Sequence, residues 1–416
     1  MRKPLYYGWA NLGVGALAMV ATLPGRTQGL GLVTEPLIAD LGIDRVSYAS
    51  VNLWATLLGA ALCLPCGRLL DRFGSRVVLT TILFALGVTV LLMSAADGLA
   101  SLFITVTLTR GLGQSALSVA SLALVGMWFA RRLNLAMGVY SVLVGMGFIA
   151  AFPAVGQAVL SSGWRPAWFE IGLVQVVVLA PLAWILVRDN PEKEGLALDG
   201  DDSKAGGLVD LSVWDALQSP AFWVFALSSS LFGLVYSGIA LFNQSILEER
   251  GFDASTYHNV LVISTLLGLA ANFGGGFLAS RFSIQRVMGI GMAVLALALL
   301  ALPSVETHTH VFLYAMAMGI AGGVVTVVFF SVWGQAFGRR HLGRIQGCAQ
   351  MMTVFASAVG PLLLAMTLES TGSYDSIFYV LAAAVVVLGI GCWYVSLPSR
   401  APELEPGRVA AGGAKA

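Results

Sequence analysis

Long apolar segments recur along the whole chain and constrain its fold more than any other feature. The hydrocarbon core of a bilayer is about 30 Å thick, so a helix of about 20 apolar residues crosses it. Segments of suitable length lie at about 8–37, 46–67, 77–96, 99–128, 135–160, 167–187, 220–247, 257–280, 287–303, 311–335, 345–368 and 375–397. Of the 416 residues 57% are hydrophobic and 11% charged, against about a quarter charged in soluble domains. The sequence therefore predicts an all-α polytopic membrane protein with twelve transmembrane helices.

The basic residues predict how these helices are oriented, because Lys and Arg concentrate in cytoplasmic loops. With a cytoplasmic N-terminus, 18 of the 23 Lys and Arg residues fall in inner loops and tails. Arg45, Arg165 and Arg250 fall in outer loops, and Arg26 and Arg110 lie within spans. We therefore expect both termini in the cytoplasm, and the protein in a bacterial-type inner membrane or a plasma membrane. The net charge of +1 argues against a nucleic-acid partner.

One long polar stretch divides the chain. Residues 189–213 are rich in Gly and charged residues, which predicts a cytoplasmic linker. It separates an N-terminal six-helix bundle at 1–188 from a C-terminal six-helix bundle at 214–397. The tail at 398–416 is rich in Pro, Ala and Gly, and we expect it to be disordered.

The two halves of the sequence repeat. The stretch GRLLDRFGSR at 67–76 has a weaker counterpart, GFLASRFSIQ, at 276–285, an offset of 209 residues. The pattern Phe-x-Arg-Arg at 129–132 recurs at 337–340, an offset of 208. Two related halves are typical of a transporter that binds its substrate between them, near the bilayer midplane.

The most specific stretch is GRLLDRFGSR, between the second and third apolar segments. Its two glycines, one acid and three arginines suit a tight turn at a membrane surface, with Asp71 able to cap the next helix. The spacing resembles the signature loop of the major facilitator superfamily, G-x-L-x-D-x-x-G-x-R, matched by Gly67, Leu69, Asp71, Gly74 and Arg76. This resemblance covers about residues 5–397 and implies a secondary transporter whose halves rock about a central cavity.

Within the superfamily the chain resembles the monocarboxylate and oxalate/formate porter group. The resemblance rests on YYGW at 6–9, RGLGQ to MWFARRLNLAMG over 110–138, SPAFW at 219–223 and FGRRHLGRIQG at 337–347. It implies a monomer that carries a small monocarboxylate. One feature departs from the group: residues 257–280 contain no Arg, Lys, Asp or Glu, where such porters usually place a basic residue. Proton coupling therefore lacks an obvious carrier, and anion exchange stays open.

The resemblance also implies a cytoplasmic latch. Asp71 is expected to face the N-terminus of helix eleven, where the helix dipole favours negative charge. Ser280 stands at the matching position of the second half, so the latch is expected on one side only. Candidates for the same charge cluster are Arg72, Arg76, Arg131 and Arg132.

Two arginines within spans are the main candidates for substrate contact. A charge at the bilayer centre costs at least about 2.5–3.5 kcal/mol, so it usually faces water, a partner or a substrate. Arg26 lies in TLPGRTQGLG, whose Pro and Gly residues would loosen helix one and let its backbone reach a ligand. Arg110 lies near the middle of helix four. The acids fall at helix ends, which favours an anionic substrate; alternatively, Arg110 only bonds neighbouring carbonyls and Arg26 reaches the outer interface.

Polar and aromatic residues on the spans are weaker candidates, because most such residues pack between helices. Tyr236 and Asn243 rank above the rest because seven residues place them on one helix face. Further candidates are Gln28, Asn52, Trp54, Gln114, Tyr140, Gln244, Asn272, Trp333 and Gln350. Glu35 and Glu170 are the acids to test for proton coupling.

Other classes of function fit less well. No nucleophile–His–acid set or metal cluster stands out, so we predict neither an enzyme nor a metal or other cofactor. One alternative is an exporter of neutral or amphipathic molecules through an aromatic cavity. Another is a non-transporting membrane sensor or scaffold, although the linker and the tail are short for an accessory domain.

Overall fold

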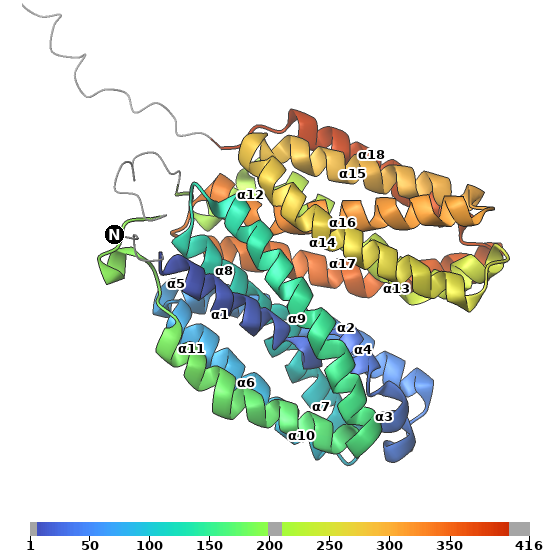
Figure 1. Ribbon diagram of the computed structural model, residues 1–416, viewed down its shortest axis with the longest axis horizontal. Coiled ribbons are helices and arrows are strands. Elements are labelled where there is room, and N and C mark those ends of the chain that lie inside the picture. The colour runs from blue at the N-terminus through green and yellow to red at the C-terminus, as the bar shows by residue number, and fades with distance from the viewer. Residues whose placement is uncertain (1–5, 199–209, 399–416) are drawn as a thin grey trace, which may run out of the picture.

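The computed structural model describes residues 6–198 and 210–398, and helices make up most of this part of the chain (Figure 1). Eleven of the described helices are long and apolar enough to cross a membrane. They cover Ser50–Phe73, Ser75–Ser94, Leu99–Trp128, Leu133–Ser162, Trp164–Leu186, Pro220–Asn243, Val262–Arg281, Ile284–Ser304, His308–Phe337, Leu342–Thr371 and Asp375–Tyr394. Each corresponds to a predicted apolar segment, with ends that differ by a few residues.

The first half of the chain contains several interrupted helices. The elements are α1 (Gly8–Val20), η1 (Leu23–Gly25), α2 (Thr27–Gly31), α3 (Thr34–Leu41), α4 (Arg45–Ala60), α5 (Cys63–Phe73), α6 (Ser75–Ser94), α7 (Leu99–Thr109), η2 (Arg110–Leu117), α8 (Ser118–Trp128), α9 (Leu133–Ser162), α10 (Trp164–Val174), η3 (Gln175–Leu179), α11 (Ala180–Leu186) and η4 (Glu192–Glu194). Two of them, η2 and η3, are π-helical turns that continue the helices on either side.

The helices of the second half are longer and less interrupted. They are α12 (Val213–Gln218), α13 (Pro220–Glu249), α14 (Ala254–Arg281), α15 (Ile284–Ala301), η6 (Leu302–Ser304), α16 (His308–Phe337), α17 (Leu342–Thr371) and α18 (Asp375–Tyr394). The short helix α12 lies at the end of the predicted linker. Ser212 starts it with a reciprocal capping arrangement to Asp215.

The first predicted span, at 8–37, has no counterpart among the eleven long apolar helices of the described part. Helix α1 ends at Val20, and Arg26 has an extended backbone with φ −92° and ψ 152°. Pro24 lacks a backbone N–H and the nearby glycines favour non-helical backbone, so the local sequence accounts for the break. The expected loosening of this helix is therefore present.

The prediction of a turn over residues 67–76 is wrong in its bounds. Helix α5 continues through Phe73, and the turn is confined to Gly74, whose φ of +84° suits glycine. Asp71 therefore lies within α5 and does not cap α6. The cap is Asp189, whose Oδ1 accepts from the backbone N–H of Arg76 at 2.9 Å.

The two halves of the chain pack together along two helix pairs, α9 with α14 and α5 with α17. Glycines permit the closest approach in both pairs. A Cβ on Gly67 of α5 would overlap the carbonyl oxygen of Gly343 on α17, and a Cβ on Gly276 of α14 would lie 3.0 Å from Gly138 Cα on α9. The second contact resembles the first with the roles of the halves exchanged, as the repeat in the sequence suggested.

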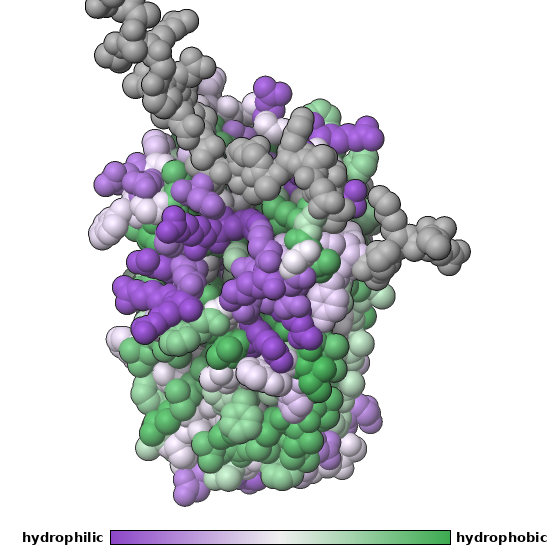
Figure 2. Space-filling view, turned by 90° about the vertical axis from the view of Figure 1, so that its left-hand side faces the viewer, coloured by the Kyte–Doolittle hydropathy of each residue, from purple (hydrophilic) through white to green (hydrophobic). Residues whose placement is uncertain are grey.

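These contacts lie toward one end of the molecule, which carries residues 72–76, 129–132, 281–286 and 338–344. We call it the basic end. Toward the other end, on the right of Figure 1, the helices of the two halves diverge. Figure 2 looks onto the basic end and shows hydrophilic side chains gathered there.

The linker and the tail are described only in part. The backbone N–H of Leu211 donates to the carbonyl of Phe337 at 3.0 Å, which fixes the end of the linker to the second half. Residues 199–209 of the predicted linker lie outside the described part, as does the tail predicted to be disordered, from residue 399 onward.

Candidate functional site

A cavity of about 210 Å³ lies between the two halves. The first half contributes residues next to the break in the first span and from α8, and the second half contributes residues from α13, α16 and α17. The lining residues are Met19, Arg26, Ser118, Leu122, Ser229, Phe232, Gly233, Val325, Thr326, Phe329, Phe330, Gln350 and Thr353. Among the described residues, the lining therefore contains one cation, several hydroxyls and an amide, and no carboxylate.

Arg26 supplies the charge of this cavity, and neutral groups hold its side chain. Its Nε donates to Thr22 Oγ1 at 2.6 Å, and its Nη2 lies 2.9 Å from Met19 Sδ. Its guanidinium lies 5.1 Å from the centre of the Phe148 ring, which suits a cation–π contact. The side chain is half-buried, and none of the described acidic residues forms an ion pair with it. A half-buried guanidinium with no counter-ion favours an anionic ligand.

Ser229 is a second polar group of the cavity with unused hydrogen-bonding capacity. Its side chain is buried on α13, and its Oγ has no hydrogen-bond partner in the described part of the chain. A buried hydroxyl without a partner costs free energy unless a ligand or water satisfies it. It lines the same cavity as Arg26, from the opposite half.

Arg110 is more deeply buried, with 3% of its surface exposed, and it does not line the cavity. Its Nη1 donates to Thr27 Oγ1 and Gln114 Oε1, both at 2.9 Å, and its Nη2 donates to Asn52 Oδ1 at 3.0 Å. A longer contact of 3.4 Å joins Nη1 to the carbonyl of Gly25. Arg110 thus joins α4 and η2 to the residues on both sides of the helix break.

Gln175 is a second residue that holds this break, and the sequence did not single it out. Its Nε2 donates to the carbonyl oxygen of Ala21 at 2.9 Å, just after α1 ends. Carbonyls at the end of a helix lack intrahelical partners, so a buried side-chain donor satisfies one of them. Arg110 and Gln175 each occupy the first position of a π-helical turn, η2 and η3. Such turns shift side chains relative to a regular helix and often occur at functional sites.

Other predicted site residues lie at the edge of the cavity or apart from it. Tyr236 is 45% exposed and stacks on the cavity residue Phe232, with ring centres 5.6 Å apart. Tyr140 contacts the ring of Phe330 edge-on at 5.5 Å. Asn243 is buried and accepts a hydrogen bond from the Tyr314 hydroxyl at 3.5 Å. The two residues paired by their spacing on α13 therefore differ in exposure.

Four further predicted residues are not part of the cavity lining. Trp54 is 57% exposed, and Gln28 is exposed at the start of α2. Trp333 is fully buried among Phe222, Phe329 and Phe337, so aromatic packing accounts for its position. Asn272 lies where α14 meets α9 and α16, with a buried Oδ1 that has no partner in the described part. The Gln244 side chain lies outside the described residues.

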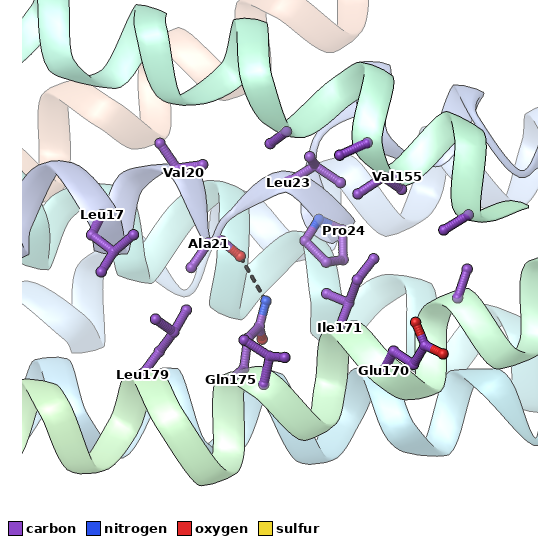
Figure 3. Close-up of a pocket in the computed structure, with 15 residues that line it drawn as sticks. Leu17, Val20, Ala21, Leu23, Pro24, Val155, Glu170, Ile171, Gln175 and Leu179 are labelled. Atoms are coloured by element: carbon purple, nitrogen blue, oxygen red, sulfur yellow. Dashed lines mark hydrogen bonds between the residues drawn. The ribbon is translucent and has the colours of Figure 1, made fainter.

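The two acids considered for proton coupling are not part of the cavity either. Glu170 lines a separate apolar groove of about 320 Å³ formed by the first span, α9 and α10 with η3, as Figure 3 shows. The same view shows Gln175 reaching Ala21 across this groove. The Glu35 side chain lies outside the described residues.

The expected latch residues divide into two groups at the basic end. Asp71 lies against the first turn of α17, where the backbone amides of Gly343 and Arg344 face its carboxylate. Arg72 lines a pocket beside it. Arg76, in contrast, donates from Nε to the carbonyl of Trp184 at 2.7 Å and covers the Trp184 ring, so it is held within the first half. Arg131 is exposed.

Most of the cavity lining could not be recognised in the sequence. Arg26 and Gln350 were candidates, but the remaining lining residues are hydroxyl, apolar and aromatic residues of the types that fill any transmembrane interface. Met19, Thr22 and Phe148, which hold Arg26, carried no separate signal.

The fold and this cavity define a multi-pass integral membrane protein with a solute-sized, cationic site between two halves. The sequence profile of the Major Facilitator Superfamily matches residues 14–253 and 225–415, and the chain belongs to this family of membrane transporters. It is 26% identical over 400 residues to Monocarboxylate transporter 13 of Bos taurus, covering 94% of this chain and 89% of that one. It is 26% identical over 275 residues to a probable nitrate/nitrite antiporter, NarK1, of Thermus thermophilus, covering 62% and 58%.

Solved structures share the fold. The human organic anion transporter MFSD10 (TETRAN) aligns with a TM-score of 0.68 at 17% identity, over 94% of this chain and 100% of that one. The transporter FucP in the outward conformation aligns with a TM-score of 0.71 at 14% identity, over 95% and 99%. The family membership places the protein among transporters and not among enzymes.

Proposed function

We propose that this protein is a twelve-helix secondary active transporter that carries a small organic anion, a monocarboxylate, bound by Arg26. The broken first segment, α1 to α3, is the twelfth span. Two six-helix bundles, residues 1–188 and 214–397, rock about the central cavity, with both termini in the cytoplasm. The names of relatives such as Monocarboxylate transporter 13 support this substrate class.

The observation that carries this proposal is the environment of Arg26. The helix break presents its guanidinium to the cavity, neutral partners hold it, and none of the described acids lines the same space. A guanidinium can donate two parallel hydrogen bonds to one carboxylate, which gives both affinity and orientation. Ser229, on the facing half, has a free hydroxyl that can bond a second oxygen of the substrate.

The size and lining of the cavity favour a small solute. Pockets for drug-sized ligands have volumes of about 300–1,000 Å³, whereas this cavity has about 210 Å³. Its aromatic residues, Phe232, Phe329 and Phe330, can cover the apolar part of an organic anion. Arg110 has all its contacts within the first half, so we assign it to holding the helix break and not to the substrate.

We assign the basic end to the cytoplasm. Because this end is closed, the structure corresponds to an outward-facing state. The close contacts of Gly67 with Gly343 and of Gly276 with Gly138 shut this end, and the helices diverge toward the other. The inward-facing state then requires these glycine contacts to separate.

For coupling we favour anion exchange over proton symport. None of the carboxylates and histidines whose side chains the structure describes lines the cavity, and Glu170 lies in the lateral groove. A second anion can occupy the Arg26 site on the return step without any proton carrier. The nitrate/nitrite antiporter relative fits an exchange mechanism and adds an inorganic anion as a candidate substrate.

The test is ligand-induced thermal stabilisation of the purified protein with small monocarboxylates, nitrate, a hexuronate, sugars and amphipathic cations, followed by counterflow in proteoliposomes. The variants are Arg26→Ala and Arg26→Lys, with the exposed Arg286→Ala as the matched control. We expect a monocarboxylate to stabilise the wild type and the control, and Arg26→Ala to remove this shift without unfolding. Stabilisation by nitrate alone would show that the substrate is an inorganic anion and not a monocarboxylate. Equal stabilisation of all variants by neutral or cationic compounds would overturn the anion assignment.

Exchange and symport are separated by the counterflow assay. Exchange predicts that uptake requires an anion inside the vesicles and is independent of a pH gradient. Uptake into empty vesicles driven by a pH gradient would reject exchange and direct attention to Glu35 and Glu170.

A further inference from the structure

A second pocket, of about 400 Å³, opens at the basic end. It is lined by Arg68, Asp71, Arg72, Arg340, His341 and Arg344. Two arginines belong to α5 of the first half, and the other two belong to the start of α17 and the turn before it in the second half. The pocket therefore lies across the junction of the halves, beside the contact of Gly67 with Gly343.

The positive charge of this pocket is only partly balanced by neighbouring acids. None of its four arginines forms an ion pair with an acid in the described part of the chain. Arg72 lies over the ring of the adjacent Phe73, and Arg340 bonds Asp210 only through its backbone N–H. The lining holds four arginines and one aspartate, a formal excess of three positive charges with His341 neutral.

Neither of the other two ionisable groups of the lining cancels the charge of the four arginines. The carboxylate of Asp71 faces the first backbone amides of α17, so part of its charge is used there. Burial, together with the charges of Arg340 and Arg344, lowers the pKa of His341. The histidine is therefore mainly uncharged near pH 7 and can either donate to or accept from a ligand.

We propose that this pocket binds a phosphate group, and that the bound phosphate holds the two halves together at the basic end. Four guanidinium groups from both sides of one pocket match the several oxygens of a phosphate, each of which can accept charge-assisted bonds. The phosphate comes either from an anionic phospholipid headgroup, since the pocket lies where the hydrophobic spans end, or from a soluble phosphate compound. This site is separate from the Arg26 cavity and does not depend on what that cavity transports.

The test uses the full-length protein and two probes. Inorganic phosphate is titrated against chloride at constant ionic strength, with thermal unfolding as the readout. Phosphatidylglycerol and phosphatidylcholine are compared for retention on the detergent-purified protein by native mass spectrometry. Hydrogen–deuterium exchange at the start of α17 reports whether the basic end is held closed.

The variant is Arg68→Gln with Arg344→Gln, one arginine from each half, and Arg340→Gln is the milder alternative if the double variant unfolds. The matched control is Arg281→Gln with Arg286→Gln, two exposed arginines at the same end that do not line the pocket. We expect phosphate or phosphatidylglycerol to bind the wild type and the control, with slower exchange in α17, and the pocket variant to bind about tenfold more weakly.

Each outcome has a definite meaning. Stabilisation by inorganic phosphate identifies a soluble ligand, and retention of phosphatidylglycerol alone identifies a lipid; both support the site. Equal loss of binding in the control variant shows only general attraction of anions to this surface and overturns the proposal. Absence of any effect of either probe on the wild type also overturns it. Loss of carboxylate binding at Arg26 would leave this result unchanged, so the two proposals fail separately.

Discussion

Gly67 of α5 and Gly343 of α17 lie so close that a side-chain methyl group on Gly67 would overlap the carbonyl oxygen of Gly343. This backbone contact joins the two halves of the transporter at its basic end. It places Asp71, one helical turn further along α5, against the first amides of α17. The spacing of Gly67 and Asp71 in the sequence therefore places both residues at the same interface, between α5 and α17.

Substituting Gly67 with Val is expected to separate the basic end, because neither backbone can move away within its helix without separating α5 from α17. We expect faster hydrogen–deuterium exchange in α5 and at the start of α17. Gly13→Val is the control, since a side chain at Gly13 meets nothing within 4 Å. Unchanged exchange in the Gly67 variant would show that the interface adapts to the extra volume.

Removing the Ser229 hydroxyl is expected to weaken substrate binding without lowering stability. The hydroxyl has no partner to lose, so Ser229→Ala leaves no other group unpaired in the described part. We expect about 0.5–1.5 kcal/mol of lost binding free energy for a neutral hydrogen bond. Ser228→Ala on the same helix is the control, because Ser228 is buried but does not line the cavity. An unchanged affinity would place the ligand away from α13.

Arg110 and Asn52 form a bond of 3.0 Å that we expect to be structural. Replacing Arg110 with Gln leaves partly buried acceptors unpaired and is expected to cost about 1–3 kcal/mol of stability. Because Asn52 is one of those acceptors, the double variant Arg110→Gln/Asn52→Ala should be less destabilised than the sum of the single variants. Thermal unfolding of all four proteins measures this coupling. Strictly additive losses of stability, together with a larger fall in substrate affinity, would indicate that Arg110 contacts the substrate.

Gln175 is expected to affect substrate binding through the helix break and not by contact. Gln175→Leu keeps the volume but leaves the carbonyl of Ala21 without its donor, so the break loses one restraint. We expect the thermal stability to fall by about 1 kcal/mol and substrate affinity to fall with it. Val177→Leu, an exposed position in the same π-helical turn, serves as the control.

The ion pair of Glu192 with Arg339 predicts a pH dependence. Nη1 of Arg339 donates to Glu192 Oε1 at 2.7 Å and joins the linker region to the second half. Burial acts to raise the pKa of Glu192, but the hydrogen bond and charge of Arg339 outweigh it and lower the pKa below its ordinary value of 4.5. The pair therefore stabilises the protein above about pH 4.5, and this contribution is lost as the pH falls through the lowered pKa.

Thermal unfolding of the wild type and Glu192→Gln across this range measures the effect. The wild type should be more stable near neutral pH, by at most about 1 kcal/mol because the carboxylate is exposed. The difference should shrink in acid. Glu194→Gln, whose carboxylate lies 3.7 Å from Arg188, is the control. A difference that persists in acid would show that the ionised pair is not responsible.

The spanning helices and the arginine of the cavity could be singled out from the sequence, because both depend on local composition. A membrane-spanning helix satisfies its backbone within one segment, so its length and hydropathy can be read directly. Arg26 stood out because an intramembrane charge is expensive wherever it lies. The Pro and Gly residues around it also predicted the break in the first span, since their effect on the backbone is local.

Only the tertiary structure decided which residues meet. Gln175 reaches Ala21, which lies 154 positions away in the sequence, and Arg68 shares a pocket with Arg344 of the other half. Arg76 had the same local features as Arg72, yet it binds Trp184 within its own half. In a membrane interior rich in small and apolar residues, contacts between helices depend on how they rotate and approach each other. That information belongs to the packing of the whole chain, and no single segment contains it.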